Sequence, residues 1–158
     1  MAQTQEKEIN CKKYIVSNDI RKIADEIITN EKVVNVEGAK IEYLLVYPHI
    51  TVHTVGRCYK AHKHTKFFSD FDYIIEFSGE AWDKLDEETR KILVLHELMH
   101  VLIKTDKLGN LIFQIRDHDI KDFSHIITKY GIDWFSDLKA QIASIYDLDP
   151  SEEEKITL

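Results

Sequence analysis

The sequence predicts one α+β domain, in which a small sheet of three to four strands packs on a buried central helix with flanking helices. At 158 residues the chain is long enough for one domain with a core of its own. Short stretches of β-branched and aromatic residues in its first half are typical of strands. Apolar residues at helical spacing before and after them predict the helices.

The first half should contain a helix followed by three strands. Residues 19–28 place isoleucines and an alanine at helical spacing, which predicts an amphipathic helix on the surface of the core. Strands are expected at 41–47, 50–55 and 72–77. The polar segment 56–71 between the last two is expected to be a loop.

The second half is expected to be mainly helical. A short helix through Ala81 and Trp82 precedes a longer one that Asp86 can cap. The longer helix should end between Thr105 and Asn110, where a glycine and an asparagine predict a turn. An apolar segment at 111–116 follows, then helices at 119–130, capped by Gly131, and at 134–146.

Composition predicts flexible ends and limits the partners. Residues 1–12 are expected to be a flexible N-terminus, 13–146 the folded domain, and 147–158 an acidic, disordered tail. A formal charge of -7 argues against general binding of nucleic acid, and the basic segment 57–66 is interpreted as a solvated loop. No apolar run is long enough to cross a membrane. The polar start and the two cysteines, Cys11 and Cys58, favour a cytoplasmic protein without disulfides.

One motif carries the chemistry. Residues 96–100 read HELMH, the HExxH pattern, inside the apolar stretch 92–103. On a helix His96 and His100 lie on the same face and can offer two nitrogens to one metal ion. Glu97 points to a neighbouring position, from which it can act as general base on a water held by the metal. The motif therefore predicts a Zn²⁺ hydrolase site.

A catalytic zinc ion usually has three protein ligands, so the rest of the chain must supply one more. The glycine and histidine that extend the motif in metzincins are replaced here by Ile103 and Asp106. A glutamate ligand downstream has no candidate before the acidic tail. His118 is favoured over His125, whose side chain would point to water if a helix begins near residue 119. Further alternatives are aspartates at positions 106, 117, 119 and 122.

Several neighbouring residues have two interpretations. Asp117, Asp119 or Asp122 could orient a liganding imidazole or could cap a helix. Arg57, Tyr130 and His125 are possible donors to an oxyanion, without a sequence signal that selects one. Large aromatic side chains at 82, 123 and 134 are assigned to packing. A second zinc site from Cys58, His62 and His64 matches no standard spacing, so solvated side chains are favoured.

The chain resembles the putative phage metallopeptidases, small zinc proteins related to the SprT-like and Spartan proteases. The similarity covers about residues 40–136 and lies in YIIEFSGEAW at 73–82, HELMH at 96–100, HDIKDF at 118–123 and GIDW at 131–134. A glycine and an arginine at 56–57 also resemble the SprT-like segment. The resemblance implies a compact zincin fold of the minigluzincin or SprT-like kind, with zinc bound by His96, His100 and His118, and Glu97 as catalytic base. At the third ligand SprT-like chains have His-Gly, whereas Asp119 follows here, so the similarity is closer to the phage family than to Spartan.

These observations predict a zinc metallopeptidase that acts on a protein or peptide, in the host cytoplasm if the chain is phage-encoded. An extended substrate could add itself as a strand to the strand 72–77, which is expected at the sheet edge. Two alternatives stay open. Zinc chemistry also serves hydrolysis of non-peptide bonds, and a zinc-stabilised binding module or phage effector needs no catalysis.

Overall fold

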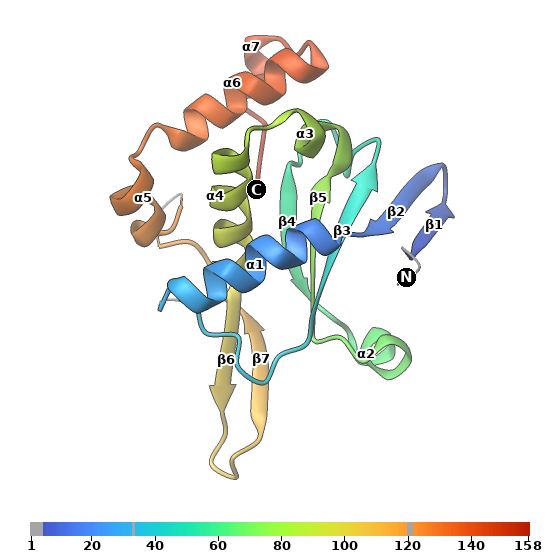
Figure 1. The fold of residues 1–158 in the computed structure, drawn as a ribbon, viewed down its shortest axis with the longest axis vertical. Helices are drawn as coiled ribbons and strands as arrows, with labels where there is room; N and C mark the ends of the chain where they lie inside the picture. The colour runs from blue at the N-terminus through green and yellow to red at the C-terminus, as the bar shows by residue number, and fades with distance from the viewer. Residues whose placement is uncertain (1–4, 33, 120–121) are drawn as a thin grey trace.

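A computed structural model describes residues 5–32, 34–119 and 122–158. A mixed five-stranded sheet forms its centre, in the order β1-β2-β3-β5-β4 (Figure 1). Only β3 and β5 are parallel, and the other neighbours are antiparallel. The strands are β1 (Glu6–Ile9), β2 (Lys12–Val16), β3 (Ile41–Tyr47), β4 (Gly56–Lys60) and β5 (Tyr73–Ser78).

Helices α1 (Asn18–Asn30) and α4 (Glu87–Met99) cover one face of this sheet, and α1 crosses in front of it in Figure 1. The alternation of side chains along β5 directs Tyr73, Ile75 and Phe77 towards the helices, and each is at most 1% exposed. Helix α4 contributes Leu93, Leu95 and Leu98 to the same core. Burial of these apolar side chains against both layers fixes α4 beside the sheet.

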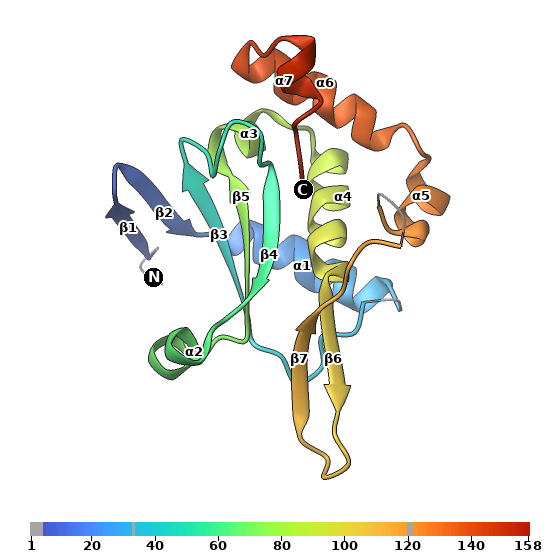
Figure 2. The same ribbon diagram turned by 180° about the vertical axis from the view of Figure 1, so that it is seen from behind.

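The remaining elements surround this centre (Figure 2). Helix α2 (Lys63–Ser69) follows β4 at one end of the sheet, and α3 (Gly79–Lys84) follows β5. The hairpin of β6 (Val101–Thr105) and β7 (Leu111–Ile115) extends away from the end of α4, tied to the sheet by the Tyr73 hydroxyl, which hydrogen bonds to the backbone of both strands. Helices α5 (Ser124–Tyr130), α6 (Trp134–Tyr146) and α7 (Pro150–Glu153) complete the fold.

Several predicted elements are confirmed. The predicted strands 41–47 and 72–77 are β3 and β5, the helix at 19–28 is α1, and α6 spans 134–146 as expected. The Asp86 side chain caps α4 by accepting a hydrogen bond from the backbone N–H of Thr89 at 2.7 Å. A clear periodicity of apolar residues and a standard helix cap are therefore sufficient to predict these elements from the sequence.

The prediction for residues 50–71 is wrong. The expected strand 50–55 is a turn with isolated bridges at Thr51 and Thr54, and the expected loop contains both β4 and α2. β4 pairs along β5, which places β5 inside the sheet and β4 at its edge. The sheet has five strands instead of three or four. Basic and polar residues in β4 conceal it, because an edge strand buries only part of its side chains.

Helix α4 ends earlier than predicted, at Met99. The apolar residues 101–103, projected as a continuation of the buried helix, begin β6 and pair with β7. A buried helix and a strand have the same continuous apolar pattern, and the pairing with residues 111–115 decides between them. The helix expected at 119–130 begins at Ser124, and residues 120–121 of that prediction lie outside the described residues.

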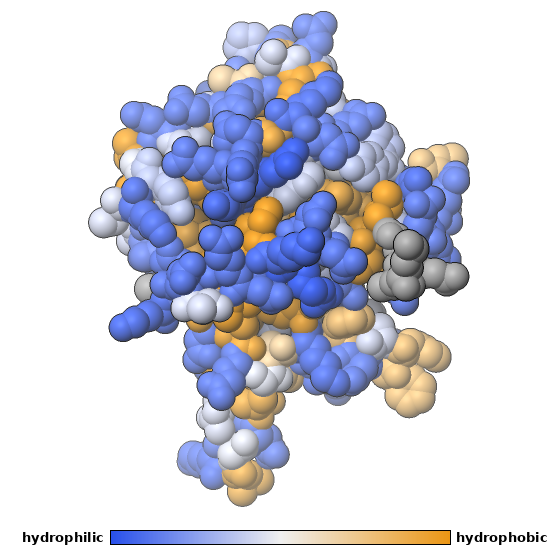
Figure 3. All heavy atoms as spheres, viewed as in Figure 1, coloured by the Kyte–Doolittle hydropathy of each residue, from blue (hydrophilic) through white to orange (hydrophobic). Residues whose placement is uncertain are grey.

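The described parts of both chain ends contain regular structure where the sequence predicts flexible segments. Residues 6–9 form β1. In the C-terminal segment, the Asp149 side chain caps helix α7, and Ile156 after this helix is only 2% exposed. Figure 3 shows one face of the molecule, mostly hydrophilic with apolar patches between the polar groups. None of the described helices is long and apolar enough to cross a membrane.

Candidate metal centre

The HExxH motif lies in the last turn of α4, at its buried side. His96 and Glu97 are 1% and 0% exposed, and the rings of Phe123 and Trp134 pack against His96. His100 is the C-terminal cap residue and still has helical backbone angles. It therefore keeps the spacing of four that aligns it with His96.

Three imidazoles converge at this point. The Nε2 atom of His118 lies 3.0 Å from Nε2 of His96 and 3.1 Å from Nε2 of His100. A single ligand atom from each ring can be chosen so that all three lie within 4.8 Å of one another. Among the described residues this is the only such group of three His, Cys, Asp or Glu side chains.

The other ring nitrogens determine what the Nε2 atoms can do. Nδ1 of His96 faces the Asp122 carboxylate at 2.9 Å, and Nδ1 of His100 faces the Arg116 carbonyl at 2.7 Å. Both partners are acceptors, so each neutral ring carries its proton on Nδ1. The Nε2 atoms of His96 and His100 are left with free lone pairs that point to the same region.

A second bond strengthens the link between His100 and the chain that follows β7. The backbone N–H of Arg116 donates to the carbonyl of His100 at 2.7 Å, while the ring of His100 donates to the carbonyl of Arg116. These two reciprocal bonds close the base of the β6-β7 hairpin. His118 follows two residues after Arg116 and is thereby directed to the other two histidines.

Asp122 is the acidic partner of this centre. It is 6% exposed and accepts hydrogen bonds from three groups: His96 Nδ1, the Phe123 backbone N–H at 2.7 Å and Trp134 Nε1 at 2.6 Å. Burial alone would raise the pKa of Asp122, but the bonds and charge from His96 and the other donors lower it below its ordinary value. The aspartate stays charged and holds the orientation of the His96 ring.

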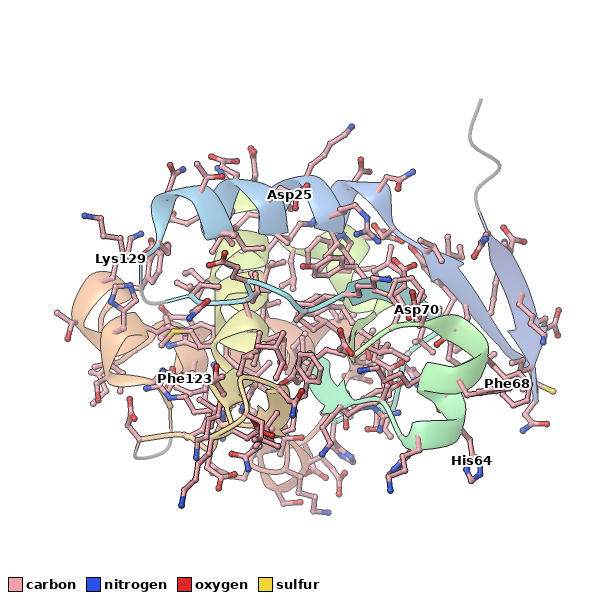
Figure 4. All side chains as sticks on the ribbon, turned by 90° about the horizontal axis from the view of Figure 1, so that it is seen from below. Asp25, His64, Phe68, Asp70, Phe123 and Lys129 are labelled. Carbon is pink, nitrogen blue, oxygen red and sulfur yellow. The ribbon has the colours of Figure 1, made fainter. Side chains whose placement is uncertain are left out.

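Phe123 packs against all three rings. Its ring centroid lies 5.2 Å from that of His96, 4.9 Å from that of His100 and 5.1 Å from that of His118. Figure 4 labels Phe123 in the region between α5 and the hairpin. Its fully buried ring excludes water from one side of the imidazoles, which limits their movement.

Glu97 is placed beside the histidines without a bonding partner. Both of its carboxylate oxygens are buried and unpaired within the described part of the chain. Burial raises the pKa of Glu97 to about 7, against a smaller opposing effect of His96. A carboxylate with a pKa near neutrality can accept and return a proton, which a general base requires.

Gly56 at the start of β4 allows the sheet edge to approach this carboxylate. A Cβ atom at that position would lie 3.2 Å from Glu97 Oε1 and 2.7 Å from the ring of Phe77. A side chain is therefore excluded there. The first residue of the edge strand and the catalytic candidate are immediate neighbours.

The arrangement fits a metal ion. Ligand nitrogens around a tetrahedral zinc lie about 3.4 Å apart, given bonds of about 2.1 Å. The measured 3.0 and 3.1 Å between Nε2 atoms are close to that spacing. At most one of these contacts can be a hydrogen bond, because His96 and His100 have no proton on Nε2. A cation bound to all three Nε2 atoms would satisfy the lone pairs that this arrangement brings together.

Other residues considered from the sequence lie elsewhere. His125, the alternative ligand, pairs with Glu31 at 2.9 Å, and Arg57 pairs with Glu76 at 2.6 Å. The thiol of Cys58 is half-buried, and burial raises its pKa further from the reactive range, assisted by the charge of Glu97. Cys58, His62 and His64 form no metal-binding group in the described ranges.

Sequence reasoning left some contributors unassigned. Asp122 was one of three equivalent aspartates, while Asp119 instead accepts from Arg116 and from the N–H of Ser124. The sequence predicts only a packing role for Trp134, whereas in the structure its indole N–H donates a hydrogen bond to Asp122. Its position as the first residue of α6 gives no signal for this bond. The Arg116 carbonyl could not be found from side-chain identity at all.

The site and fold define a metal-binding α+β protein with an HExxH helix. A family model described as putative phage metallopeptidase matches residues 12–146, so the chain belongs to that family. The family implies a metal ion and a polypeptide substrate. No curated protein and no solved structure matches the chain significantly.

Proposed function

We propose that this protein is a zinc-dependent metallopeptidase in which His96, His100 and His118 bind the metal and Glu97 is the general base. The convergence of three Nε2 atoms next to a buried, unpaired carboxylate carries the proposal. Three imidazoles are a known ligand set for catalytic zinc. The relation to SprT-like and Spartan proteases, and a zincin-like fold, are part of the same proposal and extend the family assignment.

Zinc, when bound, would supply a Lewis acid that acidifies water and polarises the scissile carbonyl. Glu97 would remove a proton from the attacking water and pass it to the leaving amine. Its raised pKa makes both transfers feasible near neutral pH. Asp122 and the Arg116 carbonyl would keep the two helix histidines in the tautomer that leaves Nε2 free.

The substrate would bind along β4 rather than β5. β4 and β5 are antiparallel, and just beyond them the backbone N–H of Ala61 donates to the carbonyl of Asp72. Backbone groups of successive residues in a strand point alternately to opposite sides, so those of Gly56, Cys58 and Lys60 point away from β5. An extended peptide can add to these groups as another strand. Because Gly56 lies next to Glu97, such a peptide would pass the metal centre.

The limits of the domain and its location are further proposals. We propose residues 13–146 as the metallopeptidase domain, with an N-terminal segment 1–12 that supplies the edge strand β1 and a C-terminal segment 147–158 whose Ile156 packs in the core. A cytoplasmic location also stays a prediction.

Two sets of variants test the function. Elemental analysis of purified wild type, His118→Ala and the matched variant His125→Ala should show one zinc per chain in wild type and His125→Ala, and loss in His118→Ala. Retention of full zinc by His118→Ala would refute the ligand assignment.

Glu97→Gln should keep the metal and the fold while peptidase activity on unfolded protein falls by about three orders of magnitude, as expected for loss of a general base. Equal activity of Glu97→Gln and wild type would exclude the mechanism. Activity of wild type on ester but not peptide substrates would favour a non-peptide hydrolase. A zinc-loaded wild type with no hydrolysis at all would favour a binding module.

A further inference from the structure

A cavity of about 240 Å³ lies directly beside the metal centre, with His96 and His118 in its wall. Its walls are His96, His118 and Asp122 on one side and Phe135, Ile156 and Leu158 on the other. An apolar cavity of about 150 Å³ is sufficient for a benzene ring. The space therefore accepts one large aliphatic or aromatic side chain.

The chemistry of the walls favours an apolar occupant. The Asp122 carboxylate is already bonded on both oxygens, through His96, Phe123 and Trp134. The two histidines are committed to the metal centre. Among the described side chains that line the cavity, no charged group is left to pair with a charged side chain, whose burial would then be costly.

The outer wall comes from the far end of the chain. Ile156 is 2% exposed, and Thr157 forms a parallel bridge with Thr54. The N–H of Thr157 donates to the carbonyl of His53 at 2.7 Å, and the N–H of Val55 donates to the carbonyl of Thr157 at 3.1 Å. Thr157 is thus bonded to His53 and Val55, in the chain immediately before β4.

This attachment relates the cavity to the path of the substrate. Val55 is the residue before Gly56, where β4 begins and where Glu97 is closest. A peptide that lies along β4 with its cleaved bond at the metal would therefore place a neighbouring side chain at the mouth of the cavity. Figures 1 and 2 both show the C-terminus between α4 and the β4 side of the sheet.

We propose that this cavity binds an apolar side chain of the substrate adjacent to the cleaved bond, and that Phe135, Ile156 and Leu158 set the size it accepts. The proposal rests on the peptidase function proposed above. It assigns the C-terminal segment 155–158 as a specificity element, although the sequence of that segment predicts only disorder.

The test is a cleavage-site profile of a tryptic peptide library, read by mass spectrometry, with zinc-loaded wild type and cavity variants. Wild type should favour Leu, Met or Phe over Ala about tenfold or more at one position flanking the cleaved bond, since a single methylene in such a pocket changes kcat/KM about tenfold. Ile156→Phe fills the cavity and should shift the preference about tenfold towards Ala and Val. Ile156→Ala should shift it towards Phe and Trp.

Ile142→Ala is the matched control, because Ile142 is equally buried in α6 but does not line the cavity. It should leave the profile unchanged. Leu158→Ala, at a partly buried position, provides a second cavity variant if Ile156→Ala does not fold. Thermal unfolding of each variant establishes that it is folded.

Binding gives a readout that needs no turnover. Zinc-loaded Glu97→Gln should bind a peptide with Leu at the selected position about tenfold tighter than the same peptide with Ala, and Ile156→Phe in that background should abolish the difference. Cleavage without apolar preference, or Ile156 variants with the wild-type profile, would overturn the pocket assignment and leave the peptidase function standing. Absence of any cleavage by wild type would instead refute the peptidase function.

Discussion

Replacement of Asp122 by Asn should weaken metal binding without removing a ligand. The carboxylate of Asp122 accepts from three donors, namely His96 Nδ1, the Phe123 N–H and Trp134 Nε1. An asparagine of the same shape has one acceptor oxygen and one NH₂ group. Whichever way the amide is turned, its NH₂ group faces a buried N–H donor.

The structure gives the size of the effect. At least one buried hydrogen bond is lost, from Trp134 in one orientation of the amide or from His96 and Phe123 in the other, and each donor left unsatisfied costs about 1–3 kcal/mol of folding stability. If the amide oxygen faces Trp134, the His96 ring loses the acceptor that keeps its proton on Nδ1. Partners of this kind change metal affinity about 10- to 100-fold, which is about 1.4–2.8 kcal/mol of binding free energy.

Competition with a chromogenic chelator measures the zinc Kd of wild type and Asp122→Asn, and thermal unfolding of the metal-free proteins measures their stability. Asp119→Asn is the matched control, since it removes the same charge three residues earlier in the chain, and Asp119 bonds to Arg116 and Ser124 instead of a ligand histidine. The reasoning is refuted if Asp122→Asn binds zinc within threefold of wild type, or if Asp119→Asn weakens binding equally.

Three further outcomes follow from contacts elsewhere in the fold. Gly56→Ala would put a Cβ atom 2.7 Å from the ring of Phe77, so the free energy of unfolding should fall by about 1–3 kcal/mol; an unchanged denaturation midpoint would contradict this contact. Tyr73→Phe removes the hydroxyl that bonds to β6 and β7, and hydrogen exchange in the hairpin should accelerate more than in the core of α4. The Lys129 ammonium lowers the pKa of Glu31 below 4.5 despite burial, so this pair stabilises the fold above about pH 4.5 and its contribution disappears as the pH falls through the lowered pKa. The stability difference between wild type and Glu31→Gln, measured by urea unfolding, should therefore shrink as the pH falls below the ordinary pKa of Glu31; a difference that does not shrink down to pH 3 would exclude the ion pair.

The elements that the sequence predicted correctly share a local signal. Helix α1 has a regular apolar stripe, α4 has the Asp86 cap, and β3 and β5 consist of β-branched and aromatic residues. Each of these patterns is decided by residues within one element. The motif that places His96, Glu97 and His100 is equally local, because helical spacing alone sets it.

The errors arose where a distant pairing decides the structure. Val101 begins β6 only because β7 pairs with it, and β4 is a strand because β5 provides a partner for its polar sequence. The sequence favours His118 over His125 because a helix from residue 119 would direct the side chain of His125 to water. In the structure this helix begins later, at Ser124. Asp122 and Trp134 form a bond across a sequence separation of 12 residues, which no local pattern reveals.

The reciprocal bonds between His100 and Arg116 have a consequence for the rest of the hairpin. They fix both ends of the segment from 101 to 115 beside the metal centre, so the position of His118 does not depend on the length of the hairpin beyond them. Residues 107–110 at the tip are exposed, and the tip is closed by hydrogen bonds from the backbone N–H groups of Leu108 and Asn110 to the half-buried Asp106. Insertions there should be tolerated, which makes the tip a suitable place for a fluorophore or an affinity tag. Relatives of this protein can therefore vary in this hairpin and keep an identical arrangement of histidines.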